Sequence, residues 1–140
     1  MYGHWKPDLS LLGEDFDPLN FFGFIYRITR KDTGRSYIGR KQLIYTERKK
    51  VKGRTNRKHI KKESDWKVYT GSCVELNIEI EKFGKEAFKF EILKFCHNKR
   101  DLGYTETKYQ FLENVLEEKF SNGERKYYNS NIMNRWFIKE

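Results

Sequence analysis

Two tyrosines, Tyr26 and Tyr37, stand in short apolar stretches that a polar, turn-like run separates. A phenol can hydrogen-bond to water or phosphate, and its ordinary pKa is about 10. A pair of aromatic side chains on one face of neighbouring strands is also an ordinary packing arrangement. The two tyrosines alone therefore leave a chemical role and a packing role both open.

The residues around these tyrosines predict a β-hairpin. Every second residue from Phe22 to Ile28 is large and apolar, which is the period of a strand. Thr33-Gly34 supplies a turn residue that tolerates positive φ, and Ser36–Ile38 forms the return strand. A loop centred just before this turn places Tyr26 and Tyr37 on the same face, directly opposite or diagonal to one another. Diagonal neighbours lie about 7–8 Å apart.

The positive charge of the chain lies in one segment. The formal net charge is +9, and residues 40–62 hold eleven Lys and Arg and one acid, Glu47. The rest of the chain is close to neutral. Such a run suits a polyphosphate partner, and its alternative is a solvated loop. Charge alone does not choose between DNA, RNA and an acidic protein, but composition and clustering favour nucleic acid.

Length and composition limit the classes of protein to which the chain can belong. The 140 residues suit one domain with a modest core, and the mean hydropathy of −0.91 predicts no membrane span. The first seven residues lack the apolar run of a signal peptide. Two cysteines, Cys73 and Cys96, are too few for a disulfide framework or a zinc cage. We expect buried free thiols in a reducing cytoplasm.

The remaining pattern predicts two helices and a third strand. Ser72 and Glu75 match a capping box that begins a helix, and Gly84 suits its end. Residues 87–95 alternate like a strand, and residues 105–120 carry the apolar stripe of a second helix. The order of hairpin, basic segment, helix, strand, helix and tail predicts an α+β domain on a small sheet.

Three further segments carry weaker signals. Residues 1–20 predict an extended arm with little structure, packed through Trp5, Leu9, Leu11, Leu12 and Phe16. Leu43–Arg48 could begin a helix, and residues 126–132 suit a short strand or extended segment. Trp66 and Tyr69 either pack in the core, which we favour, or stack on bases.

The two tyrosine stretches, Phe24-Ile25-Tyr26 and Tyr37-Ile38-Gly39, resemble the motifs that name the GIY-YIG nuclease family. The resemblance implies a small, mostly antiparallel central sheet flanked by helices. It also implies a glutamate on a later helix and an asparagine after it, which Glu106 and Asn129 match. The implied organisation is an arm at 1–20, a nuclease domain at 21–135 with a basic insertion at 40–62, and a tail at 136–140.

The family also carries an arginine beyond the second motif. Arg48, nine residues past Gly39, is our choice, and Arg40, Arg54 and Arg57 compete with it. A family histidine would most resemble His59. One departure from the family pattern is that Phe24 separates Gly23 from Ile25-Tyr26.

The resemblance implies how such a site would act. Glu106 would be the metal ligand for Mg²⁺, with Mn²⁺ as the alternative, since Mg²⁺ is commonly held by one or two carboxylates plus waters. Tyr26 would act as base or orient water, and Tyr37 would position water or phosphate. Arg48 would stabilise charge on the scissile phosphate, and Asn129 would hold the geometry of the site.

The expected function is metal-dependent hydrolysis of double-stranded DNA by a compact endonuclease of phage-encoded or homing type, acting in the cytoplasm of a host cell. The alternatives are a nucleic-acid-binding module that lost catalysis and an RNA-binding protein of ribosomal type. The basic segment would contact the DNA backbone through eleven side chains. These are Arg40, Lys41, Lys49, Lys50, Lys52, Arg54, Arg57, Lys58, His59, Lys61 and Lys62.

Overall fold

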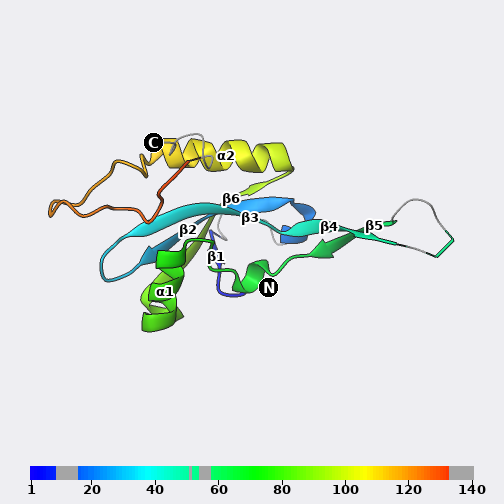
Figure 1. Ribbon diagram of the computed structural model, residues 1–140, viewed down its shortest axis with the longest axis horizontal. Coiled ribbons are helices and arrows are strands. Elements are labelled where there is room, and N and C mark those ends of the chain that lie inside the picture. The colour runs from blue at the N-terminus through cyan, green and yellow to red at the C-terminus, as the bar shows by residue number, and fades with distance from the viewer. Residues whose placement is uncertain (9–15, 51, 54–57, 133–140) are drawn as a thin grey trace.

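The computed structural model describes residues 1–8, 16–50, 52–53 and 58–132. A four-stranded sheet in the order β1-β6-β2-β3 forms the centre, with helix α1 on one face and helix α2 on the other (Figure 1). The strands are β1 (Lys6–Pro7), β2 (Gly23–Arg30), β3 (Ser36–Gln42), β4 (Ile44–Lys49), β5 (Lys58–Glu63) and β6 (Phe88–Cys96). The α-helices are α1 (Val74–Phe83) and α2 (Lys99–Leu112), and 3₁₀ turns cover Pro18–Asn20, Trp66–Val68 and Lys85–Ala87.

The sheet is mostly antiparallel, which confirms the predicted α+β class. Strand β2 pairs antiparallel with both β3 and β6, and only the short β1 runs parallel to β6. Within the described part of the chain, no helix is long and apolar enough to cross a bilayer.

The β2–β3 hairpin has the predicted register. Ile28 pairs with Tyr37, and Tyr26 pairs with Gly39, so the two tyrosines are diagonal neighbours on one face. Their ring centroids lie 6.1 Å apart. Gly34, at φ 76°, provides the left-handed turn residue. Strand alternation thus brings the two phenols together, as the sequence predicts.

The N-terminal segment belongs to the core. Trp5 is buried beside Phe24, Tyr26 and Phe90, and its indole Nε1 donates to the Trp66 carbonyl at 2.5 Å. Phe16 packs on Phe21 and Phe95, while Leu9, Leu11 and Leu12 fall outside the described residues. The predicted packing through Trp5 and Phe16 is therefore confirmed, because a large aromatic side chain is driven into the core by the area it buries, and Lys6–Pro7 add a short strand.

The basic segment contains a β-ribbon where the sequence suggested the start of a helix. Strands β4 and β5 pair antiparallel, from Ile44 opposite Glu63 to Lys49 opposite Lys58, and the ribbon extends away from the body (Figure 1). The helix prediction for Leu43–Arg48 is wrong for two reasons. The β-branched and aromatic residues of β4 favour a strand, and dense like charge opposes a helix.

The first helix ends as predicted but begins differently. Gly84, at φ 84°, ends α1. The capping box is wrong, because the N-cap is Cys73 and no side chain caps the helix. Its two predicted members have tertiary partners: the Ser72 hydroxyl hydrogen-bonds with the Tyr37 hydroxyl, and Glu75 forms a 2.7 Å ion pair with Arg35.

The second helix has other bounds than predicted. Helix α2 begins at Lys99, where the Asn98 side chain accepts a hydrogen bond of 2.8 Å from the Asp101 amide. It ends at Leu112, shortly before Asn114 adopts a left-handed φ of 51°. Glu106 therefore lies in the middle of the helix, and the predicted third strand is confirmed as β6.

Candidate active site

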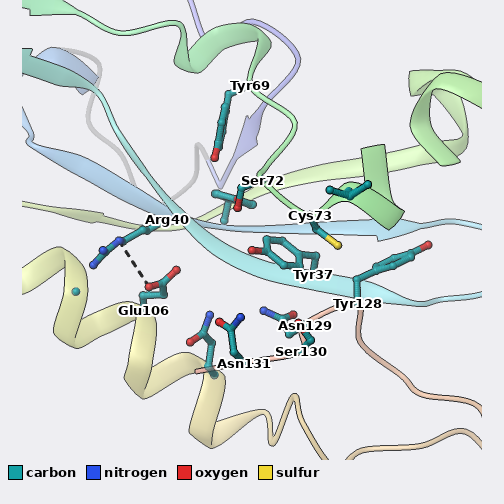
Figure 2. Close-up of a pocket in the computed structure, with 14 residues that line it drawn as sticks. Tyr37, Arg40, Tyr69, Ser72, Cys73, Glu106, Tyr128, Asn129, Ser130 and Asn131 are labelled. Carbon is teal, nitrogen blue, oxygen red and sulfur yellow. Dashed lines mark ion pairs between the residues drawn. The ribbon is translucent and has the colours of Figure 1, made fainter. Parts of the chain in front are cut away.

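A pocket of about 640 Å³ lies across the free edge of β3 (Figure 2). The loop before α1 borders it on one face of the sheet, α2 borders it on the other, and the segment after Tyr127 runs along the edge of β3. Four of the five predicted catalytic residues line it: Tyr26, Tyr37, Glu106 and Asn129. Alternation along β3 explains this placement, because Tyr37 and Arg40 leave the strand on opposite faces and meet the pocket from two sides.

The two phenols form the floor and one wall of the pocket. Tyr26 is only 1% exposed, and burial raises the pKa of its phenol well above the ordinary value, with smaller contributions from Tyr37 and Tyr69. Burial also raises the pKa of Tyr37, although the hydrogen bond with Ser72 opposes this. Both groups are therefore protonated at neutral pH and can donate hydrogen bonds.

Gly39 permits the close approach of the two tyrosines. A Cβ atom at this position would lie 2.5 Å from the Tyr26 hydroxyl and 2.9 Å from a ring carbon of Tyr37. Its backbone is ordinary strand, so the reason for glycine here is space. The second motif thus needs a glycine because the phenol of the first motif lies against it.

We expect Gly39→Ala to displace the Tyr26 ring, because neither the strand nor the buried ring can yield by the required distance. The free energy of unfolding should fall by about 1–3 kcal/mol, the usual range for overpacking. Chemical denaturation measures this effect, and an alanine variant with wild-type stability would contradict this packing.

Glu106 and Arg40 face each other in the pocket. Glu106 Oε1 lies 3.7 Å from Arg40 Nε, with side-chain exposures of 19% and 47% respectively (Figure 2). Burial raises the pKa of the Glu106 carboxyl, and the Arg40 guanidinium partly offsets this. Gly103 makes room for the arginine, because a Cβ there would lie 3.0 Å from Arg40 Nη1.

Asn129 holds the edge strand. Its Nδ2 donates to the Ile38 carbonyl at 2.8 Å, and its Oδ1 accepts from the Ile38 amide at 3.0 Å. Gln110 Nε2 donates to the same carbonyl at 3.0 Å. These amides take the place of a neighbouring strand at Ile38, next to Ser36, where the edge of β3 bonds to the backbone of residues 126–128. Asn129 thereby fixes the strand that carries Tyr37 and Arg40.

The predicted arginine lies elsewhere. Arg48 is exposed on β4 opposite His59, and neither residue lines the pocket. Placing Arg48 in the site was wrong, because it assumed a helix that would turn back toward the tyrosines. Of the competing arginines, Arg40 reaches the pocket directly from β3, and Arg54 and Arg57 lie outside the described residues.

The other predicted DNA contacts divide among several places. Lys41 lies on β3, with its Nζ 4.1 Å from the centre of the Tyr69 ring and 2.7 Å from Asp65. His59, Lys61 and Lys62 lie on β5, and Lys50 and Lys52 lie beyond β4. The backbones of Lys49 and Lys58 belong to the ribbon.

The sequence reading missed several residues that line the pocket. Ser72, Cys73, Gln110, Ser130 and Asn131 surround the tyrosines and Glu106. Tyr69 also lines it, while Trp66 is fully buried, so core packing is confirmed for the tryptophan. Gln110 follows Glu106 by four residues, and this helical spacing was the available signal that both face the same way.

The donor set suits one hard divalent cation with several waters. Glu106 is the only acid among the described residues that line the pocket. No group of three or more His, Cys, Asp and Glu side chains occurs anywhere in the described ranges, so they build no zinc-type cage. Mg²⁺ keeps most of its waters and needs only one or two carboxylates, which this polar pocket can provide.

This sheet, with two tyrosines on the β2–β3 hairpin and a glutamate on α2, defines a class of nuclease domain: the chain belongs to the GIY-YIG endonuclease family. The family model that matches is described as "Putative endonuclease segE, GIY-YIG domain", and the match covers residues 9–132. Comparisons with curated proteins and with solved structures returned no match.

Proposed function

We propose that this protein is a divalent-metal-dependent endonuclease that hydrolyses phosphodiester bonds in double-stranded DNA. The observation that carries the proposal is the partly buried Glu106, placed opposite Arg40 and beside two protonated phenols in one open pocket. A buried carboxylate costs folding free energy, and its retention at the mouth of a polar pocket supports a chemical role.

Glu106 would hold the metal ion, which supplies charge neutralisation at the phosphate and stabilises the leaving oxygen when bound. Arg40 would donate to the phosphate oxygens through its planar guanidinium as charge develops on them. The raised pKa values of Tyr26 and Tyr37 favour orienting water and phosphate over acting as a base. Asn129 and Gln110 position these groups through β3.

The DNA substrate is supported by the endonuclease family and by the charge of residues 40–62. Both cysteines are free thiols, which fits a reducing compartment such as the cytoplasm of a host cell. A phage-encoded or homing endonuclease is the biological type that the family resemblance suggests, and it forms part of the proposal.

Cleavage of supercoiled plasmid tests the proposal. The wild-type protein should convert the plasmid to nicked or linear forms with Mg²⁺ or Mn²⁺, and excess EDTA should stop the reaction. Cutting that persists in EDTA would contradict metal dependence. Retention of the plasmid on a gel without any cutting would contradict the enzyme and favour a binding module, and tight binding to RNA alone would favour an RNA-binding protein.

The pH dependence of cleavage should report the ionisation of the partly buried Glu106 carboxyl. Glu106 must be ionised to bind the cation, so the rate at subsaturating Mg²⁺ should fall tenfold per pH unit below its pKa. Burial raises that pKa above the ordinary value of 4.5, so the acid limb should begin above this pH. Arg40→Ala should move the limb further toward neutral pH, because Arg40 lowers the pKa. An acid limb that begins at or below pH 4.5 would contradict the assignment of Glu106 as the metal ligand.

A further inference from the structure

The β4–β5 ribbon is a separate two-stranded sheet that is anchored to the domain at its base. Leu43 at its base is fully buried, and its carbonyl accepts a 2.8 Å hydrogen bond from the Ser64 amide. The Ser64 hydroxyl donates to the Gln42 carbonyl at 2.5 Å, and the Trp66 indole donates to Glu63 at 2.9 Å. Both strands of the ribbon are therefore fixed at their base to the domain that carries the pocket, and the ribbon projects from it (Figure 1).

The two faces of the ribbon differ. On one face, Lys62 forms a 2.5 Å ion pair with Glu47, so its charge is already matched. The other face carries Ile44–Glu63 at the base, where Glu63 accepts from the Trp66 indole, and then the cross-strand pairs Thr46–Lys61 and Arg48–His59, whose four side chains are exposed. Among the residues that the structure describes, no acid forms an ion pair with Arg48, His59 or Lys61, and we call the surface of these two outer pairs the Arg48 face.

We propose that the ribbon enters the major groove of the DNA substrate with its Arg48 face toward the bases, and so contributes sequence preference next to the cleavage site. This inference rests on the proposed function. Arg48 and Lys61 can donate to guanine, while Thr46 and His59 add further hydrogen-bonding groups. A loose basic loop would contact phosphates alone and carry little sequence choice.

The dimensions of the ribbon fit this placement. A major groove about 12 Å wide admits a two-stranded β-ribbon. The six residues of β4 span about 20 Å, which corresponds to about six base pairs of duplex. Strand β3 carries Arg40 in the pocket and leads through Leu43 into β4. The ribbon therefore starts beside the pocket where we propose that the scissile phosphate binds. A-form RNA has a deep, narrow major groove that side chains cannot read, so duplex DNA is the favoured occupant.

Lys61 and Lys62 provide a matched pair for the test. They are neighbours of one residue type, each substitution removes one positive charge, and they lie on opposite faces of the ribbon. The test uses the full chain with Glu106→Gln, so that DNA is bound without being cut. Duplexes selected from a randomised pool give the sequence preference, and protection of guanine N7 from dimethyl sulfate reports major-groove contact.

We expect selected sequences with preferred bases within about six base pairs on one side of the cleavage position, and N7 protection there. Adding Arg48→Ala or Lys61→Ala should remove that protection and weaken binding to the selected duplex by about tenfold or more. Lys62→Ala should retain the preference. Unchanged preference in both Arg48→Ala and Lys61→Ala, absence of N7 protection, or preference for RNA duplex would overturn the inference. If the wild-type protein cuts DNA without groove protection, the inference alone fails; if groove protection occurs without cutting, the proposed function alone fails.

Discussion

Glu106→Gln should abolish DNA cleavage and raise the melting temperature of the protein. The neutral amide is a weaker ligand for a hard cation than a carboxylate, and the loss of the metal's contribution of several kcal/mol lowers the rate by about a thousandfold or more. Most single changes at a buried position lower stability, so an increase would mark a residue retained for chemistry.

The expected increase in stability follows from the direction of the pKa shift. Burial raises the pKa of Glu106 in the folded state above that in the unfolded chain. The stability that the neutral carboxyl provides is fully present below the unfolded pKa and is lost as the pH rises through the folded pKa. At neutral pH the ionised group therefore opposes folding, and a neutral amide removes that cost. Because the Arg40 side chain is about half exposed, the loss of its ion pair with Glu106 costs the folded state little free energy.

Glu117→Gln is the matched control, because it removes the same charge from an exposed side chain outside the pocket. Rates of plasmid cleavage and thermal unfolding followed by circular dichroism measure both properties of the two variants. The Glu117 variant should cleave like the wild type. A Glu106→Gln protein that cuts within tenfold of the wild-type rate would remove this carboxylate from the mechanism.

Arg40→Ala should lower the rate of the chemical step by about a hundred- to thousandfold, the usual cost of losing a donor to developing negative charge. Arg40 is the arginine within reach of Glu106 among the described residues that line the pocket. The loss should appear in single-turnover cleavage at saturating DNA. Arg40→Lys should recover only part of the rate, because an ammonium group lacks the planar pair of donors.

Arg100→Ala tests whether any loss of positive charge has this effect, since Arg100 is exposed on the first turn of α2 and does not line the pocket. It should cleave at the wild-type rate. If Arg100→Ala and Arg40→Ala lowered the rate equally, general electrostatic attraction would explain the result. If Arg40→Ala were fully active, another group would have to stabilise the phosphate.

The sequence predicted the part of the site that depends on strand alternation. Once residues 22–28 alternate and the turn lies near Gly34, the register that places Tyr26 beside Tyr37 follows, and the structure has this register. The predicted end of α1 at Gly84 has the same kind of cause, because a glycine can adopt the positive φ required there. Sequence patterns predict such features well because neighbouring residues alone decide the backbone conformation there.

Tertiary partners decided the features that the sequence reading missed. Ser72 and Glu75 match a capping box, but Tyr37 and Arg35 compete for their side chains, so the cap does not form. The start of α2 is fixed by Asn98, whose side chain caps the helix at the Asp101 amide. This cap lies before the apolar stripe from which the helix was predicted.

The arginine was missed for a topological reason. Counting nine residues past Gly39 to Arg48 assumes a helix after β3, whereas Ile44, Tyr45 and Thr46 continue as a strand. The chain therefore leads away from the pocket, and the residue that reaches Glu106 is the one directly after Gly39. A sequence gives the spacing of residues, but only the path of the backbone decides which of them meet.

Binding of Mn²⁺ to the protein in the absence of DNA, followed by electron paramagnetic resonance, tests the central claim that Glu106 makes this pocket a metal-dependent nuclease site. The wild-type chain should bind one Mn²⁺ that excess Mg²⁺ displaces. Glu106→Gln should weaken this binding by about tenfold or more while leaving DNA affinity in place, since even indirect metal partners cost that much when removed. Equal Mn²⁺ affinity in the wild-type and Glu106→Gln proteins would contradict the claim.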